Sequence, residues 1–196
     1  MVVRHIGVLG LQGAYAKHFA MLNSLNIKPI NVRYSDELER CDGLIIPGGE
    51  STTITKLLEV NQLFDPLVQF AKDKPVFGTC AGMILMAKSV DDKRVQTLNL
   101  IDIFVDRNGY GRQVHSFIND LDVKLDGNSF SMRGFFIRAP RILKTGDNVE
   151  ILSSINKEPV LVRQGHHIAC SFHPELTNEC RIHQYFTTLS TELSIA

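Results

Sequence analysis

The segment that decides the fold is PVFGTCAG, at residues 75–82. Its first part is a short apolar run that predicts a buried strand, and residues 81–88 predict a helix. Gly78 and Gly82 lie two positions before and after Cys80, and small residues there permit a strand-to-helix turn that is too tight for larger side chains. The segment is therefore typical of a nucleophile elbow, which would expose the Cys80 thiol at the carboxyl edge of a sheet.

The position of Cys80 also favours reactivity. The N-terminus of a helix carries partial positive charge and unpaired N–H groups, which favour a thiolate over a thiol. The same spacing fits a buried structural cysteine in a tight turn, because cysteine is among the most frequently buried residues.

The chain before this segment alternates strands and helices. Strands are expected at residues 5–9, 29–32 and 43–46, and helices at residues 14–25, 52–60 and 63–71. Short apolar strands that alternate with helices indicate a parallel sheet covered on both faces.

The second half of the chain is mostly strand. Alternating apolar residues predict half-buried strands at residues 101–105, 114–118, 121–125, 129–137, 149–155, 159–163 and 168–172, before a closing helix at residues 179–193. We expect an α/β fold in one domain over residues 1–196, with an antiparallel extension of the sheet.

Composition excludes several classes of protein. The 196 residues include 21 Lys and Arg against 21 Asp and Glu, so no bulk positive charge points to nucleic acid or an anionic membrane. The longest apolar runs fall far short of the roughly 20 residues that span a bilayer, and the first residues do not resemble a secretory signal. The four cysteines form no C-x-x-C pair, so we expect reduced thiols and a cytoplasmic protein.

A base for the thiolate is found in SFHPE, at residues 171–175. His173 leaves a predicted strand at its carboxyl end, where sites on open α/β sheets gather. Glu175 lies two positions later, and the intervening proline favours extended geometry, which would let both side chains point the same way. A histidine at a strand end with a glutamate at a helix start fits the same residues.

Metal binding is not expected. Cys170 and His173 have C-x-x-H spacing, but no second pair of ligands accompanies them. The adjacent His166 and His167 follow Gln164-Gly165 and are expected in a solvated turn.

A third candidate element is PGGESTT, at residues 47–53, also between a strand and a helix. Two successive glycines let backbone N–H groups converge on an oxyanion or carboxylate, whereas a capped turn at Ser51 or Thr52 is the simpler alternative. No lysine follows, so this is not a Walker loop, and the glycine spacing at residues 7–13 does not match a dinucleotide site.

Together these motifs resemble the class I, triad-type glutamine amidotransferases, and within them the family of glutaminase subunits of pyridoxal 5′-phosphate synthase. The similarity runs from residue 6 to about residue 186. Its motifs are residues 77–82 and 172–177 for the superfamily, and residues 7–13, 47–53, 107–113 and 136–140 for the family.

The resemblance implies a role for each matching residue. Cys80 would be the nucleophile, His173 the base and acid, and Glu175 the residue that orients His173. The positions that would hold L-glutamine are Gly49, Glu50, Ser51, Arg107, Ile137 and Arg138, and the backbone N–H groups for the oxyanion would come from Gly48, Gly49 and Ala81. Arg107 and Arg138 also fit a role in salt bridges. Gly109-Tyr110 departs from the family pattern, and the extra glycine would loosen the loop that carries Arg107.

The implied fold has three layers and is flavodoxin-like, with a mostly parallel central sheet and antiparallel strands in the second half. The implied reaction is hydrolysis of L-glutamine through a thioester, without a cofactor, and transfer of ammonia to a separate synthase subunit. Alternatives are the glutaminase of another synthase, such as the imidazole glycerol phosphate system, a non-catalytic glutamine-binding module, or a cysteine peptidase on the same scaffold.

Overall fold

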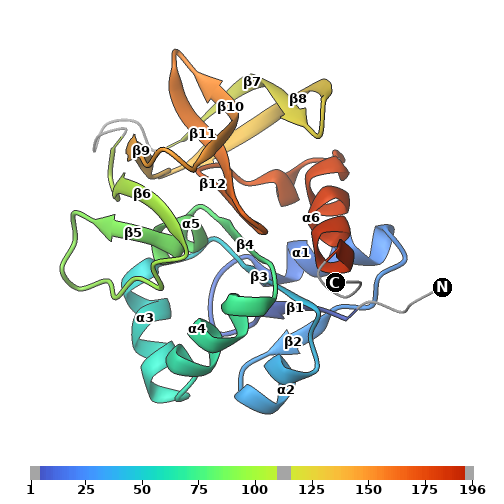
Figure 1. Cartoon of the computed structure of the whole chain (residues 1–196), viewed down its shortest axis with the longest axis vertical. Helices are drawn as coiled ribbons and strands as arrows, with labels where there is room; N and C mark the ends of the chain where they lie inside the picture. Colours follow the sequence, from blue (N-terminus) through green and yellow to red (C-terminus); the bar gives the residue numbers. More distant parts are fainter. Residues whose placement is uncertain (1–4, 110–115, 193–196) are drawn as a thin grey trace.

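The computed structural model describes residues 5–109 and 116–192, and within them the main element is a seven-stranded sheet (Figure 1). In spatial order its strands are β10 (Glu150–Ile155), β11 (Glu158–Gln164), β12 (His167–Cys170), β4 (Val76–Thr79), β3 (Gly43–Ile46), β1 (Ile6–Leu9) and β2 (Ile30–Val32). The strands from β12 to β2 pair in parallel, and β11 and β10 extend the sheet antiparallel. The predicted mixed sheet is confirmed.

Helices cover both faces of this sheet, so the molecule has three layers. One face carries α2 (Ser35–Glu39), α3 (Ser51–Val60), α4 (Phe64–Asp73) and α5 (Ala81–Met86), and the other carries α1 (Tyr15–Ser24) and α6 (Arg181–Glu192). Alternate residues of β3 show the division: Leu44 and Ile46 belong to the core on the α3–α4 side, and Ile45 belongs to the core on the α1–α6 side. Sheet residues buried on both faces explain the uninterrupted apolar runs of the first half.

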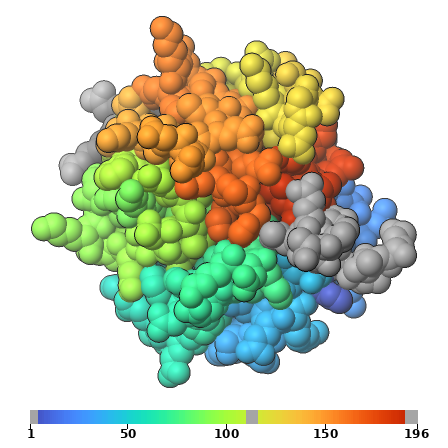
Figure 2. Space-filling model, in the orientation of Figure 1, coloured from blue at the N-terminus to red at the C-terminus, as the bar shows by residue number. Residues whose placement is uncertain are grey.

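The second half adds two smaller sheets. A long hairpin of β7 (Ser116–Leu125) and β8 (Asn128–Ile137) packs over the α6 face, and β5 (Ala87–Val90), β6 (Ile101–Asp106) and β9 (Arg141–Thr145) form a three-stranded sheet. Figure 2 shows the strands β7 to β11, yellow to orange, gathered at one end of the molecule, with the helices α2 to α4, blue to green, at the other.

Several expected boundaries are wrong. The helix expected at residues 81–88 ends at Met86, because the carbonyls of Leu85 and Met86 accept hydrogen bonds from the N–H groups of Leu98 and Leu100, at 2.7 and 2.9 Å. The chain then continues as β5. The strands expected at 114–118 and 121–125 are one strand, β7, over Ser116–Leu125. Residues 114 and 115 of the first prediction lie outside the described residues.

Two elements and one turn were also not as expected. The sequence did not reveal α2 or β9, and His167 is the buried first residue of β12 rather than part of a solvated turn. Its Nδ1 accepts a hydrogen bond from the N–H of Val76, at 3.2 Å, which joins the starts of β12 and β4.

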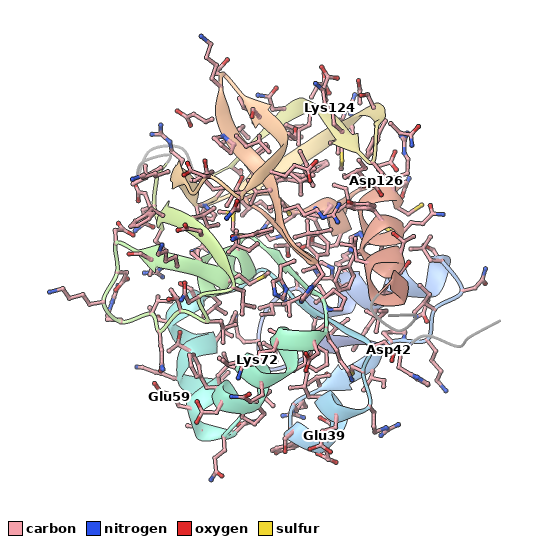
Figure 3. The ribbon with its side chains drawn as sticks, in the orientation of Figure 1. Glu39, Asp42, Glu59, Lys72, Lys124 and Asp126 are labelled. Carbon is pink, nitrogen blue, oxygen red and sulfur yellow. The ribbon has the colours of Figure 1, made fainter. Side chains whose placement is uncertain are left out.

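The surface agrees with the balanced composition. Acidic and basic side chains are both present at the two ends of the molecule, as the residues labelled in Figure 3 illustrate. No helix in the described part of the chain combines the length and the apolar character that a membrane crossing requires.

Candidate active site

Cys80 occupies a strained turn between β4 and α5. Its φ and ψ are 51° and −105°, a backbone conformation that residues with a Cβ rarely adopt. The turn is held by a hydrogen bond from the Cys80 N–H to the carbonyl of Cys170, at 2.8 Å. The flanking glycines are required by space, since a Cβ on Gly78 would lie 2.6 Å from the backbone of Gly82, and a Cβ on Gly82 would lie 2.0 Å from the carbonyl oxygen of Ile46. The structure therefore has the elbow geometry that the spacing predicted.

His173 and Glu175 face this thiol from the end of β12. Nδ1 of His173 lies 2.6 Å from Oε1 of Glu175, which sits in a short 3₁₀ helix, η1 (Pro174–Leu176). The His173 ring lies beside Cys80, whose thiol donates to the carbonyl of Ile137, at 3.8 Å. Both side chains of the histidine–glutamate pair are almost fully buried, at 9% and 0% exposure. The structure thus brings the three candidate triad residues together in one chain of contacts.

The charge state of His173 follows from these contacts. Burial by itself lowers the pKa of His173, but hydrogen bonding to Cys80 and Glu175, together with their negative charges, outweighs burial and raises the pKa to about 10. His173 is then an imidazolium at neutral pH. An imidazolium beside a sulfur nucleophile stabilises the thiolate and can protonate a leaving group.

The Gly48–Gly49 loop lies against the same residues. A Cβ on Gly48 would be 2.4 Å from Cε1 of His173 and 3.3 Å from Cβ of Cys80, so only glycine fits between them. The loop is held by two hydrogen bonds: the N–H of Ala14 donates to the Gly48 carbonyl at 2.9 Å, and the N–H of Gly48 donates to Oγ1 of Thr79 at 3.1 Å. In this structure the Gly48 N–H is therefore engaged by Thr79.

The helix after this loop is capped by Glu50 rather than by Ser51 or Thr52. The Glu50 carboxylate accepts from the N–H and Oγ1 of Thr53, both at 2.8 Å, and pairs with Arg107. Burial raises the pKa of Glu50, but hydrogen bonds from Thr52 and Thr53 and the Arg107 charge lower it to about 2. Glu50 is thus ionised at neutral pH.

Arg107 is positioned from its other side by two aspartates. Its Nη1 lies 2.8 Å from Oδ2 of Asp92, and its backbone N–H donates to Oδ1 of Asp91 at 2.9 Å. Arg107 therefore takes part in salt bridges and also borders the site. Residues 110–113 of its motif, including Tyr110, lie outside the described residues, whereas Gly109 packs against the side chain of Arg141.

These residues enclose a cavity of about 290 Å³. Every candidate site residue except Glu175 lines it, and Glu175 lies behind His173. The lining residues for which no site role was predicted are Gln12, Gly13, Ala14, Ile84 and Asn108, of which Gln12, Gly13 and Asn108 belong to the family motifs. Gln12 accepts the N–H of Glu50 at 2.8 Å, which ties the first strand–helix turn to the wall of the site. No cluster of three or more metal-ligating side chains occurs among the residues that the structure describes.

The fold and site first define a class. A cysteine on a strand–helix elbow, beside a histidine that a carboxylate holds, is the arrangement of enzymes that cleave acyl groups through a covalent thioester.

Comparison with known proteins then gives the family. The chain belongs to the SNO glutamine amidotransferase family, whose model matches residues 8–192. It is 49% identical to the pyridoxal 5′-phosphate synthase subunit PdxT of Oenococcus oeni, over 95% of this chain and 97% of the relative, and 47% identical to PdxT of Shouchella clausii, over 97% of each. The family predicted from the motifs is confirmed.

Solved structures agree. A crystal structure of a glutamine amidotransferase superposes with a TM-score of 0.89 at 43% identity, covering 95% of this chain and 98% of that chain. The structure of PurLQS from Thermotoga maritima matches with a TM-score of 0.71 at 16% identity, over 96% of this chain and 99% of that chain, which shows a shared fold alone. The predicted α/β amidotransferase fold is confirmed.

Buried histidines outside the triad make a test of stability possible. Among the described residues these are His18, His167 and His183. Burial is the main cause that lowers the pKa of His167 and of His183 to about 3, and it lowers the pKa of His18 well below its usual value. Between pH 6.5 and 3 the unfolded chain therefore binds more protons than the folded chain, so stability rises with pH across this range and is lost on acidification.

We expect the free energy of unfolding to fall between pH 6.5 and 5, with each buried histidine contributing up to about 1.4 kcal/mol per pH unit. Urea unfolding of the wild type and of His167→Asn measures this slope. Asparagine can still accept the Val76 N–H but does not titrate, so the variant should lose about 1 kcal/mol less per pH unit. Parallel slopes would show that His167 is not neutral in the folded state.

Proposed function

We propose that this chain is the glutaminase subunit of pyridoxal 5′-phosphate synthase, which hydrolyses L-glutamine to L-glutamate and ammonia. The observation that carries the proposal is the contact chain Cys80–His173–Glu175 at the edge of a cavity with charged walls. The names of the PdxT relatives supply the pathway. The whole chain would act as one glutaminase domain in the cytoplasm, without a bound cofactor.

The cavity suits the two ends of glutamine. The amino-acid end carries a carboxylate and an ammonium group, which the guanidinium groups of Arg107 and Arg138 and the carboxylate of Glu50 match in charge. The backbone at Gly49, Ser51 and Ile137 would position the rest of the substrate. The carboxamide would then lie against Cys80.

The reaction would proceed by acyl transfer. The Cys80 thiolate attacks the carboxamide carbon, and the charge that develops on oxygen is stabilised by backbone N–H groups, for which we propose Gly49 and Ala81. The Gly48 N–H, which was also expected to serve the oxyanion, donates to Oγ1 of Thr79 in this structure. His173 gives its proton to the departing nitrogen, and ammonia leaves as the C–N bond breaks. His173, now neutral, takes a proton from water, whose oxygen attacks the thioester and releases glutamate and the thiolate.

A partner follows from this proposal. Ammonia released here would pass to a separate synthase subunit in a hetero-oligomeric complex. We would measure glutamate and ammonia release by the chain with and without purified synthase subunit, and capture each candidate partner on the immobilised chain. Binding and activation by the pyridoxal 5′-phosphate synthase subunit are expected. Binding to the imidazole glycerol phosphate cyclase alone would refute the assignment.

Glu175→Gln tests the orienting role. The glutamine oxygen can still accept the Nδ1 proton of His173, so we expect a loss of about 10–100-fold in kcat, smaller than the loss from removing the thiol. The negative charge is gone, so the pKa of His173 should fall and the alkaline limb of the rate profile should move to lower pH. Steady-state kinetics from pH 6 to 10 provide the measurement.

Glu179→Gln is the matched control, because Glu179 pairs with Arg181 near the surface and does not line the cavity. It should retain wild-type kinetics. An unchanged alkaline limb in Glu175→Gln would contradict the proposed role of Glu175.

A further inference from the structure

Behind the candidate triad, on the side away from the cavity, α1 brings a buried histidine against Glu175. His18 is fully buried, and its Nε2 lies 3.6 Å from Oε2 of Glu175 and 3.2 Å from Oγ1 of Thr79. Nothing in the local sequence pattern around His18 distinguishes it from a packing residue.

We propose that His18 is a positioning residue for the triad: it holds the second carboxylate oxygen of Glu175 and the hydroxyl of Thr79, and so fixes the orientation of the His173 ring. This inference rests on the proposed glutaminase function.

The second carboxylate oxygen of Glu175 needs a hydrogen-bond donor. Its side chain is fully buried, Oε1 is engaged by His173, and Oε2 has no hydrogen bond among the described residues. A buried carboxylate oxygen without a donor is costly. Nε2 of His18 lies 3.6 Å from Oε2, just beyond hydrogen-bond length, so a small shift of the ring would let its single N–H reach Oε2 as well as Oγ1 of Thr79. Without that N–H, the Glu175 carboxylate would be free to rotate, and Oε1 would no longer hold Nδ1 of His173 in one orientation.

His18 can donate to Glu175 only when its ring proton resides on Nε2. Its Nδ1 lies 3.0 Å from Nε2 of His183, a second buried histidine on α6. Both rings are neutral at neutral pH, since burial lowers the pKa of each. When His183 Nε2–H donates to Nδ1 of His18, the proton of His18 resides on Nε2, facing Glu175 and Thr79. Phe77 packs edge-on against His183, at 5.5 Å between ring centroids, and holds that ring in place.

Thr79 connects His18 to the Gly48–Gly49 loop. Its Oγ1 accepts the N–H of Gly48 at 3.1 Å and contacts His18 on its other side. Thr79 is also the residue directly before Cys80. His18 therefore contacts both the carboxylate of the triad and the hydroxyl that holds the Gly48–Gly49 loop, so one side chain links the two halves of the site.

Two substitutions separate positioning from packing. His18→Gln places an amide near the position of Nε2, within reach of Glu175 and Thr79. His18→Asn places its amide near the position of Nδ1, so it keeps a polar contact with His183 but does not reach Glu175. His167→Asn is the matched control, because it alters a buried histidine at the opposite end of β12.

Two measurements report the outcome. The first is the pH profile of kcat and KM for glutamine hydrolysis, in the complex with the synthase subunit. The second is the rate at which iodoacetamide alkylates Cys80 in the chain alone, followed by peptide mass spectrometry. Thermal unfolding of each variant confirms that it is folded.

We expect His18→Asn to lower kcat about 10–100-fold with KM changed by less than about threefold, and to move the alkaline limb to lower pH. Cys80 alkylation at pH 7 should slow several-fold, because a misplaced Glu175 sustains the His173 imidazolium less well. His18→Gln should restore most of both, and His167→Asn should change stability alone.

Wild-type kinetics and alkylation in His18→Asn would overturn the inference, and so would equal losses in both His18 variants with an unshifted pH profile. If the wild-type complex releases no ammonia from glutamine, the proposed function fails instead. The alkylation profile then still decides whether His18 positions the triad.

Discussion

Cys80→Ala should abolish glutamine hydrolysis, with a loss of at least about 10⁴-fold in kcat, while the protein remains folded. The thiolate supplies the only covalent step of the proposed mechanism, and alanine offers no atom that could replace it. The fold should tolerate the change because the φ of 51° at this position costs any residue with a Cβ about the same. The substitution also removes volume rather than adding it at a crowded turn.

The measurement is ammonia and glutamate release by the wild-type and variant complexes, with circular dichroism and thermal unfolding of each chain. Cys180→Ala is the matched control, since it removes a partly exposed thiol that does not line the cavity. It should retain full activity. Equal glutamate release by Cys80→Ala and wild type would overturn the catalytic role.

The elbow and the histidine–glutamate pair could be predicted because much of each is encoded locally. Gly78 is required by a close contact with Gly82, four positions along the chain, and Glu175 reaches His173 across a single proline. The parallel sheet was also predictable, since strands buried on both faces are uniformly apolar. Parallel strands then bring their carboxyl ends to one edge, which is where these motifs meet.

The boundaries that failed depend on distant partners. The end of α5 is set by hydrogen bonds from residues 98 and 100, and β9 exists because it pairs with β6. Neither contact leaves a signal in the local pattern. Strand β7 was split in the prediction because the polar residues Asn119 and Asp120 interrupt the apolar alternation, although the backbone ladder with β8 continues through them.

The unpredicted part of the site has the same origin. His18, Thr79 and Gln12 each act through contacts with residues 31 to 165 positions away, among them the contact between His18 and His183. A histidine within a helix is compatible with surface, core or site. Only the packing of α1 against η1 shows that His18 lies beside Glu175.

For Gly82→Ala, the close packing at the elbow predicts the opposite change in stability from the one that helix propensity alone predicts. Gly82 lies in α5, and replacement of a helical glycine by alanine ordinarily stabilises by about 1 kcal/mol. Here the new Cβ would lie 2.0 Å from the carbonyl oxygen of Ile46 and 2.9 Å from its carbonyl carbon. Both are backbone atoms of β3, which cannot turn aside as a side chain could.

We therefore expect Gly82→Ala to destabilise the protein by about 3 kcal/mol, because relief of the clash must separate α5 from β3. Activity should fall by about 100-fold as well, since Ile46 leads directly into the Gly48–Gly49 loop and α5 carries Cys80 at its start. Urea unfolding and glutamine hydrolysis at saturating substrate measure the two effects.

Gly165→Ala provides the comparison, because a Cβ there meets no atom within 4 Å and the cost arises only from its φ of 57°. That variant should lose about 1 kcal/mol and keep full activity. The two variants thus measure separately the cost of a steric clash, at Gly82, and the cost of a positive φ, at Gly165. A Gly82→Ala protein as stable and as active as the wild type would show that α5 does not pack against β3 as closely as this structure places it.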